Sequence, residues 1–254
     1  MGVYAMTGGA TGIGAAIRKR LSDAGHTVVV VDLKDADVIA NLGMPEGRAA
    51  AIAGIRAAAP AGLDGFIPCA GVASHVPDRA LIASVNYFGT VELLEGLKDL
   101  LVARRGTVVL VSSNSAPMNV SEELVEACLA NDEARTRGIA AATSHGQLVY
   151  GGSKRAVARW MRRNARAWAQ LGVRMNAIAP GYTQTPMTEA VEKDPNFGPA
   201  IREFLASIPV GRPGQPEDMA DAVDFLLSPK ASFVCGTVLF VDGGHDAMMR
   251  PDAF

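Results

Sequence analysis

Tyr150 and Lys154 stand four residues apart in the segment Tyr150-Gly151-Gly152-Ser153-Lys154. Positions i and i+4 of a helix share one face, so a helix here would bring the phenol and the ammonium group together. A free tyrosine ionises near pH ~10, and a neighbouring cation lowers that pKa. The pair therefore predicts a general acid/base for a substrate oxygen. Many helices carry the same pair by chance, as a half-buried tyrosine and an exposed lysine, so the rest of the chain has to decide.

The start of the chain predicts a nucleotide-binding unit. An apolar strand at Val3–Thr7 is followed by a glycine-rich turn, an amphipathic helix that ends at Gly25, and a valine-rich strand at His26–Val31. Glycines let the backbone approach a pyrophosphate, while the helix N-terminus offers free N–H groups and a positive dipole end. Placed between a strand and a helix, the pattern Gly8-x-x-x-Gly12-x-Gly14 is a strong signal for a dinucleotide.

Asp32 ends the second predicted strand and indicates which dinucleotide binds. A carboxylate there accepts hydrogen bonds from the adenosine ribose hydroxyls and repels a 2′-phosphate. Lys34 is near, but neither Leu33 nor the glycine turn supplies an arginine for such a phosphate. The position favours NAD over NADP, with a turn-capping aspartate as the alternative interpretation.

Strands and helices alternate along the remaining chain. This alternation, with no break in composition, predicts one α/β domain over residues 1–254: a single doubly wound, Rossmann-like parallel sheet with helices on both faces. The predicted helices are 45–59, 80–104 with interruptions at Gly89 and Gly96, 150–171 and 217–227, and the further strands are 63–68, 107–111, 173–179 and 237–241.

Two segments depart from this alternation. Residues 114–149 separate a strand from the Tyr150 helix, and we interpret them as an insertion made of one helix, beginning near Ser121, and a loop. Residues 180–216 are long, irregular and rich in proline, which is typical of a substrate loop or lid.

Composition narrows the functional classes. The 254 residues are 49% hydrophobic and carry a net charge of −2 with no basic block, which argues against nucleic acid as a partner. The apolar runs are strand-length, far below the ~18 residues of a membrane span, and no charged leader precedes the first strand. Three cysteines at irregular spacing predict reduced thiols, no metal site and a cytoplasmic protein.

With these features in place, the chain resembles the short-chain dehydrogenase/reductase family over nearly its full length. The resemblance implies an oxidoreductase in which Tyr150 is the general acid/base, Lys154 lowers its pKa and binds the nicotinamide ribose, and Ser113 orients the substrate oxygen. Asn86 would support Lys154 through water. The matching motifs are Thr7-Gly8-x-x-x-Gly12-x-Gly14, Asp32, Ala70-Gly71, Asn86, Ser113, Tyr150-x-x-x-Lys154, Pro180-Gly181 with Thr185, and Asp242-Gly243-Gly244.

The resemblance also implies a set of cofactor contacts. Ser113 is chosen over Ser112 by motif alignment, although a strand-end serine can simply be a cap, as Asn86 can simply satisfy a helix kink. Thr185 would hold the carboxamide, or serve as turn chemistry before a proline. The expected NAD-binding residues are Gly8, Thr11, Gly12, Ile13, Gly14, Asp32, Leu33, Asn41, Leu42, Ala70, Gly71, Tyr150, Lys154, Pro180, Thr183 and Thr185.

Three departures from the family pattern stand out. Pro68-Cys69 precedes Ala70-Gly71 where the family often has two asparagines, and Asn41 stands where an aspartate often bonds the adenine. Asparagine still offers a donor and an acceptor, so we expect altered affinity. The third departure is the insertion 114–149, which lengthens the connection from Ser113 to Tyr150.

The insertion and the ending Asp246-Ala247-Met248-Met249-Arg250-Pro251 resemble a bacterial branch of 3α-hydroxysteroid dehydrogenases/carbonyl reductases. This implies a small apolar ketone or secondary alcohol as substrate, including a steroid. Two alternatives stay open: a dehydrogenase of aromatic alcohols such as coniferyl alcohol, and a nucleotide-binding regulator that has lost chemistry.

The insertion also suggests an oligomeric state. In many family members the helices around 80–104 and 150–171 pack against a twofold mate. An apolar Leu124/Cys128 face would cover that surface here and leave the opposite edge, made by residues 217–227 and 237–241. A twofold interface there would be self-complementary and would cover an edge strand, so we expect a homodimer. If the insertion only capped the substrate cleft, the usual tetramer would persist.

Overall fold

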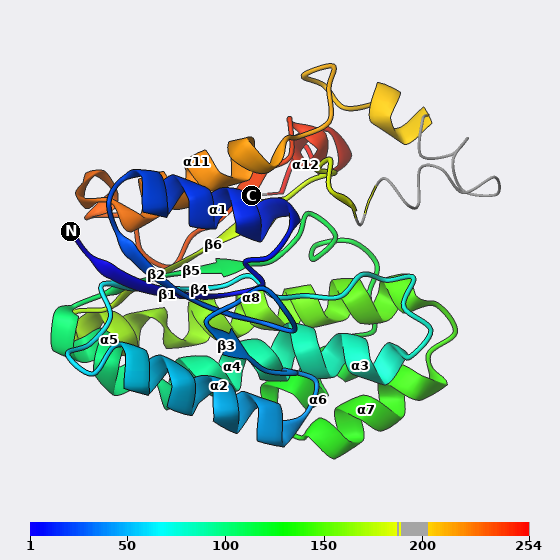
Figure 1. Cartoon of the computed structure of the whole chain (residues 1–254). Helices are drawn as coiled ribbons and strands as arrows, with labels where there is room; N and C mark the ends of the chain where they lie inside the picture. The colour runs from blue at the N-terminus through cyan, green and yellow to red at the C-terminus, as the bar shows by residue number, and fades with distance from the viewer. Residues whose placement is uncertain (187, 189–202, 254) are drawn as a thin grey trace.

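The computed structural model describes residues 1–186, 188 and 203–253. In that part of the chain, parallel strands form one sheet in the order β3-β2-β1-β4-β5-β6-β7, with helices on both faces (Figure 1). The predicted fold class is confirmed. The strands are β1 (Val3–Thr7), β2 (Thr27–Asp32), β3 (Val38–Ile39), β4 (Gly65–Pro68), β5 (Thr107–Val111), β6 (Arg174–Pro180) and β7 (Val238–Val241).

Strand register gathers the functional ends of the strands at one edge. Thr7 pairs with Val31 on one side and with Pro68 on the other, so β1, β2 and β4 finish at the same level. Neighbouring residues of β1 face opposite layers, since Ala5 joins one core cluster and Met6 the other. Both layers are apolar, which explains why the strands read as continuous hydrophobic runs.

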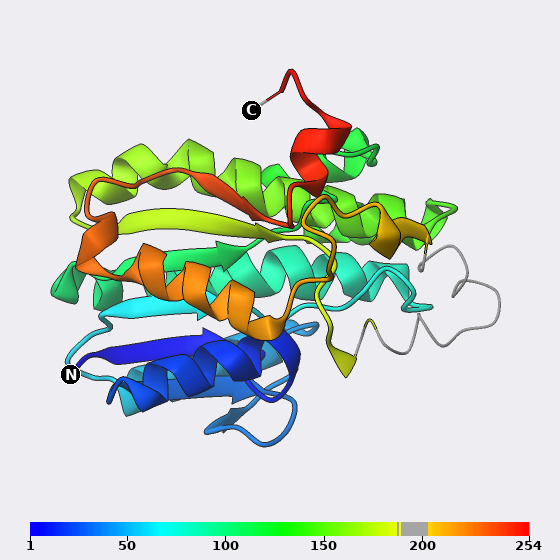
Figure 2. The ribbon, with the colours of Figure 1, turned by 90° about the horizontal axis from the view of Figure 1, so that it is seen from above.

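One face of the sheet is covered by two adjacent helices, α1 (Gly12–Asp23) and α11 (Pro216–Leu227), which lie side by side across the strands (Figure 2). Ile17 and Leu21 of α1 meet Met219 and Val223 of α11 over the sheet. The other face carries α2 (Pro45–Ala58), α3 (Arg79–Ala83), α4 (Gly89–Gly96), α5 (Lys98–Arg104) and α8 (Gly146–Gln170).

The helical region predicted at 80–104 is divided by more than its glycines. A π-helical segment, η1 (Ser84–Phe88), stands between α3 and α4, and Leu97 separates α4 from α5. Gly89 therefore begins a helix instead of interrupting one, while the break near Gly96 is confirmed. A π turn widens the helix locally, and such turns are frequent at functional sites. Asn86 lies in this turn.

The insertion contains two helices, so the prediction of one helix and a loop was wrong. α6 (Glu122–Leu129) begins at Ser121 as predicted and packs on α8, and α7 (Glu133–Ala142) packs on α3. The second helix escaped notice because its apolar face is weak: only Thr136 and Ala140 are buried. Tertiary ion pairs and an aspartate N-cap hold it instead. Together the two helices cover α3 and α8, as expected of the insertion.

Smaller differences concern element ends. α8 starts at Gly146, a turn earlier than predicted, and extends the helix that carries Tyr150. β3 was not predicted, because two residues are too few to show the alternating pattern of a strand. α12 (His245–Met249) follows the glycines at 243–244, where no helix was predicted. A short 3-10 turn, η2 (Pro229–Ala231), precedes β7. Within the predicted substrate loop 180–216, residue 187 and residues 189–202 lie outside the described residues.

Among the described helices, none is both long and apolar enough to cross a lipid bilayer.

Candidate active site

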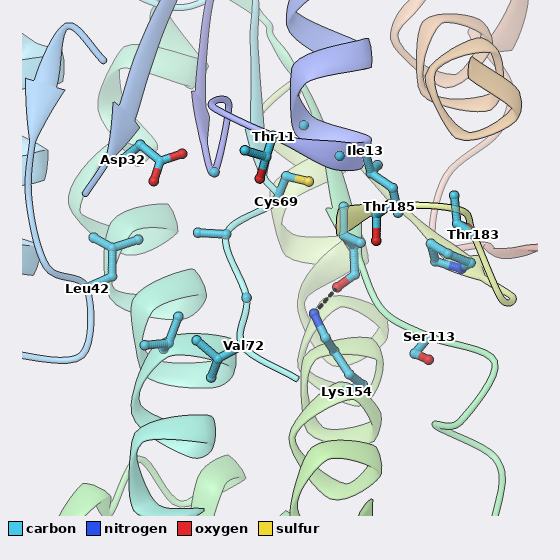
Figure 3. Close-up of a pocket in the computed structure, with 18 of the residues that line it drawn as sticks. Thr11, Ile13, Asp32, Leu42, Cys69, Val72, Ser113, Lys154, Thr183 and Thr185 are labelled. Atoms are coloured by element: carbon cyan, nitrogen blue, oxygen red, sulfur yellow. Dashed lines mark hydrogen bonds between the residues drawn. The ribbon is translucent and has the colours of Figure 1, made fainter. Parts of the chain in front are cut away.

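A cavity of about 430 Å³ opens at the carboxyl ends of the central strands (Figure 3). Ligands of doubly wound sheets bind at this edge. The cavity brings together every residue predicted for catalysis or cofactor binding except Asn86. These are Gly8, Thr11, Gly12, Ile13, Gly14, Asp32, Leu33, Asn41, Leu42, Ala70, Gly71, Ser113, Tyr150, Lys154, Pro180, Thr183 and Thr185.

The glycine turn provides a close backbone cradle. A Cβ on Gly14 would stand 1.7 Å from the Gly8 carbonyl oxygen, so only glycine lets α1 start this near to β1. Gly8 adopts a φ of 75°, and a Cβ there would meet the Ala70 backbone at 2.7 Å. The turn ends on the N-terminus of α1, whose N–H groups face the cavity edge. A dinucleotide pyrophosphate fits this arrangement.

Asp32 connects the cradle to β2. Its Oδ2 accepts a hydrogen bond from the Ala10 N–H at 3.0 Å, and its Oδ1 accepts one from the Leu33 N–H at 2.7 Å. The carboxylate stays on the cavity wall (Figure 3). It therefore fixes the turn and presents negative charge to the cavity.

Lys154 is buried between α8 and β5. Its side chain is 5% exposed, and Nζ donates to the Val111 carbonyl oxygen at 2.9 Å (Figure 3). Ser112 Oγ donates to the Lys154 carbonyl oxygen at 2.9 Å and ties the same two elements together. Burial lowers the pKa of Lys154 to about 8. The ammonium lies 5.9 Å from the centre of the Tyr150 ring, on the same helix face.

The pKa of Tyr150 differs from the expectation. Burial raises it above its ordinary value, and the hydroxyl of Ser113 only partly opposes this rise. We had expected Lys154 to lower the pKa, but the ammonium is directed to the Val111 carbonyl and desolvation of the phenolate dominates. Burial of Tyr150 therefore favours the protonated form of the phenol.

Ser112 and Ser113 have different partners. Ser112 Oγ is used in holding α8 to β5. Ser113 Oγ accepts a hydrogen bond from the Ser115 N–H at 3.1 Å and faces the phenol of Tyr150. This geometry agrees with the choice of Ser113 over Ser112.

Asn86 does not line the cavity. It is fully buried in η1, where its Oδ1 accepts from the Val72 N–H at 2.8 Å and its Nδ2 donates to the Val72 carbonyl at 3.1 Å and to Ser153 Oγ at 3.3 Å. A Cβ on Gly71 would lie 3.2 Å from Asn86 Oδ1 and 3.4 Å from Lys154 Nζ. Asn86 thus holds the loop after β4, at Gly71–Val72, and α8 against each other.

The loop after β6 lines one side of the cavity. Thr188 Oγ1 donates to the Thr183 carbonyl at 2.7 Å and receives the Thr185 N–H at 2.9 Å. Thr185 in turn lies over the glycine turn, since a Cβ on Gly12 would meet its Cγ2 at 3.2 Å. Thr185 therefore packs against the glycine turn beside Gly12.

Several cavity residues were missed by sequence reasoning. Cys69 was noticed only as a departure, and burial raises the pKa of its thiol to about 11, so it lines the wall as a neutral group. The three-residue spacing of Thr185 and Thr188 could have indicated that the two side chains bond each other. The apolar residues of the cavity wall cannot be told from core residues by sequence. The missed residues are Val31, Ala40, Cys69, Val72, Leu81, Val85, Val111, Ser112, Pro186 and Thr188, whereas Gly181 was named only within the Pro180-Gly181 motif.

Several known proteins are similar in sequence to this chain. A family model described as enoyl-(acyl carrier protein) reductase matches residues 136–246. The 3-alpha-hydroxysteroid dehydrogenase/carbonyl reductase of Comamonas testosteroni is 41% identical over the full length of both chains. The cis-4-hydroxycyclohexanecarboxylate dehydrogenase of Sinomonas cyclohexanicum is 32% identical over 97% of each.

A solved structure is also similar to this chain. The crystal structure of the 3-alpha-hydroxysteroid dehydrogenase from Pseudomonas sp. B-0831, complexed with NADH, superposes with a TM-score of 0.95 at 44% identity and covers 99% of this chain and 100% of that one. The fold and the cavity define a dinucleotide-binding oxidoreductase. The chain belongs to the short-chain dehydrogenase/reductase family, which confirms the predicted NAD-dependent enzyme class acting on hydroxyl and carbonyl groups.

The buried Lys154 predicts a measurable cost to stability. Its pKa is about 8 in the folded protein and ~10.4 in an unfolded chain, so folding disfavours the charged form. At pH 7 we expect Lys154→Met to raise the melting temperature by roughly 3 °C while it abolishes turnover. Above pH 8 Lys154 loses its proton in the folded protein but keeps it in the unfolded chain. The difference in melting temperature between the variant and the wild type should therefore be smaller at pH 9.5 than at pH 7. A variant that melts well below the wild type at both pH values would contradict this account.

Proposed function

We propose that this enzyme interconverts apolar secondary alcohols and ketones with NAD, using Tyr150 as the general acid/base. The observation that carries the proposal is the common cavity, which sets Ser113, Tyr150 and Lys154 beside a backbone cradle that fits a dinucleotide. Each of the three has a chemical task that its position supports.

In the reductive direction, Ser113 donates a hydrogen bond to the carbonyl oxygen and Tyr150 delivers a proton to it. Bound NADH supplies the hydride that adds to the carbonyl carbon. In the oxidative direction the alcohol would give its O–H proton to the Tyr150 phenolate and the hydride on its carbon to bound NAD+. Lys154 would hold the nicotinamide ribose through its ammonium and stabilise the Tyr150 phenolate. The raised pKa of Tyr150 suits the donor role at neutral pH.

The cofactor would lie along the cavity with its adenosine end at β2. Asp32 would accept hydrogen bonds from the ribose hydroxyls, and its charge would disfavour a 2′-phosphate. Asn41 and Leu42 would flank the adenine. Asn41 Oδ1 already accepts the Gly43 N–H at 3.0 Å, which leaves its amide NH₂ for the base. Thr183 and Thr185 would hold the nicotinamide end.

The names of the relatives support a substrate class. Both curated relatives named above act, by their names, on a hydroxyl group carried by a ring, as in a hydroxysteroid or a hydroxycyclohexane. We extend this to a ring-borne secondary alcohol or ketone, including a 3α-hydroxysteroid. No structural observation favours coniferyl alcohol. The alternative of a non-catalytic regulator loses support, because the relatives are oxidoreductases and the catalytic trio shares one cavity.

The assembly we propose is a homodimer through α11 and β7. The insertion buries Leu124, Val125 and Cys128 and so covers the α3 and α8 faces. At the opposite edge β7 is unpaired on its outer side within the described sheet. Large apolar side chains are exposed there: Phe225 on α11 at 43%, Phe233 before β7 at 103%, and Leu239 on β7 at 37%. We further propose a cytoplasmic location, which suits the unpaired cysteines of the structure.

Catalysis is tested by Tyr150→Phe, which removes the transferable proton and keeps the ring. We expect kcat to fall by at least ~10²-fold, the loss typical of a missing general acid/base, with NAD+ affinity little changed. Tyr4→Phe, in β1 away from the cavity, is the matched control. Steady-state kinetics with a cyclic secondary alcohol and a binding titration provide the readouts. Near-normal turnover would remove Tyr150 from the mechanism.

Cofactor choice is tested at Asp32. Asp32→Ala should weaken NAD+ binding, but it also removes the acceptor of the Ala10 N–H. Asp32→Asn keeps an acceptor and removes the charge, so it should relax discrimination against NADP+ by about tenfold, because like-charge repulsion is lost. Comparison of kcat/KM for both cofactors gives the answer. A wild type that uses NADPH better than NADH would refute the role of Asp32.

Assembly is tested by light scattering coupled to size exclusion. We expect a dimer mass for the wild type and a monomer mass for Phe225→Asp, because the variant buries a charge in the interface. Ala103→Asp places the same charge on the exposed face of α5 and should leave the dimer intact. A stable wild-type tetramer would show that the insertion does not block the other face.

A further inference from the structure

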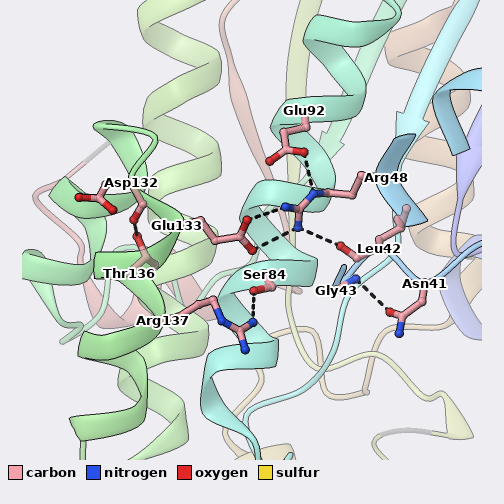
Figure 4. A network of polar contacts seen from close by, with 10 residues as sticks. All are labelled: Asn41, Leu42, Gly43, Arg48, Ser84, Glu92, Asp132, Glu133, Thr136 and Arg137. Atoms are coloured by element: carbon pink, nitrogen blue, oxygen red, sulfur yellow. Dashed lines mark hydrogen bonds and ion pairs between the residues drawn. The ribbon is translucent and has the colours of Figure 1, made fainter. Parts of the chain in front are cut away.

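The second insertion helix reaches the cofactor cavity through one buried arginine. Arg48, in the first turn of α2, donates from Nε to Glu92 of α4 at 2.7 Å and from Nη2 to Glu133 of α7 at 2.5 Å (Figure 4). Its Nη1 donates to Glu133 at 3.2 Å and to the Leu42 carbonyl oxygen at 3.3 Å. One guanidinium thus joins the insertion, two further helices and a wall of the cavity.

This cluster is withdrawn from water and electrically matched. The Arg48 side chain is 2% exposed, against 22% for Glu133 and 36% for Glu92. Burial acts to lower the pKa of Arg48, but the hydrogen bonds and charges of Glu133 and Glu92 outweigh it and raise the pKa overall. A buried guanidinium that lost one carboxylate would pull its remaining partners toward itself. Among those partners is the Leu42 carbonyl.

The loop that carries Leu42 has almost no space in which to adjust. A Cβ on Gly47 would lie 2.0 Å from the Asn41 carbonyl oxygen, so α2 rests directly on the loop backbone. A Cβ on Gly43 would lie 2.5 Å from Leu81, and one on Gly89 would lie 3.1 Å from the Leu42 Cβ. Because the loop is held from both sides, a small movement of the guanidinium is transmitted to Leu42.

A second contact of α7 reaches the neighbouring wall. Arg137 donates from Nη1 to Ser84 Oγ at 2.7 Å, where the π-helical segment begins (Figure 4). Leu81 and Val85, on either side of Ser84, line the cavity. The helix α7 is therefore linked to cavity residues on two sides, to Leu42 through Arg48 and to Leu81 and Val85 through Ser84, although none of its own residues lines the cavity.

We propose that Glu133 and Arg48 are positioning residues for NAD: the insertion, through this ion pair, sets the Asn41–Leu42 loop that receives the adenine. This inference rests on the proposed assignment of that loop to the adenosine end. It gives the insertion a role in cofactor affinity that is independent of any role in assembly. Neither residue would touch the reacting atoms, so the step from alcohol to ketone should proceed normally once the cofactor is bound.

Three variants test the proposal on the full-length protein. Glu133→Gln keeps the side-chain shape and removes one charge, Arg48→Lys keeps the charge but loses the forked geometry, and Arg48→Met removes both. The readouts are the NAD+ and AMP dissociation constants by titration calorimetry, kcat at saturating NAD+, and the melting temperature. Glu122→Gln is the matched control. Glu122 lies in α6, the other helix of the insertion, where it pairs with Arg155 and Arg159 of α8 and does not line the cavity.

We expect Glu133→Gln and Arg48→Met to weaken both NAD+ and AMP binding by about tenfold, with kcat within about twofold of the wild type. Arg48→Lys should fall between them and the wild type, and Glu122→Gln should bind both ligands normally. Should Arg48→Met fail to fold, Glu133→Gln still decides the question.

Unchanged NAD+ and AMP affinity in folded Glu133→Gln would overturn the proposal. So would equal weakening in Glu122→Gln, because the effect would then come from general loss of insertion stability. A wild type in which AMP does not compete with NAD+ would instead refute the proposed placement of the adenosine, and would do so before any variant is compared.

Discussion

The attachment of α8 to the end of β5 is the constraint on which the site depends. Lys154 Nζ bonds the last carbonyl of β5, and Ser112, the next residue of the chain, bonds the Lys154 carbonyl in return. These two bonds fix the height of α8 against the sheet. Because Tyr150 lies one turn before Lys154, its distance from Ser113 follows from the same attachment. Burial of an ammonium is costly, and it lowers the pKa of Lys154 to about 8.

The cofactor side of the cavity is built on a different principle, close backbone contact. Gly14 and Gly8 allow α1 to begin against β1, and Asp32 holds the turn through the Ala10 N–H. The two principles meet at Gly71, where the strand end, Asn86 and Lys154 come within a few ångströms of one another. The π turn that carries Asn86 directs its amide to both Val72 and Ser153, so the catalytic helix and the cofactor wall share one buried hydrogen-bonding group.

The insertion changes the surroundings of this family fold without altering its centre. α6 covers α8 with an apolar face, and α7, poorer in apolar residues, is held mainly by charge. The Arg48 cluster links that charged helix to Leu42 in the cavity wall. A segment that separates Ser113 from Tyr150 in the chain is thus placed around the outside of the cavity, where it can affect both assembly and cofactor binding.

The sequence by itself determined the strand and helix order, the glycine cradle, the position of Asp32 and the Tyr150/Lys154 face, because each depends on local spacing or chain alternation. It also indicated which serine faces the phenol. Only the tertiary structure decided the direction of the Tyr150 pKa, since burial raises it more than the Ser113 hydroxyl lowers it. The helix α7, the π turn at Asn86 and the Arg48 cluster were likewise decided by contacts between segments far apart in the chain, which no local pattern records.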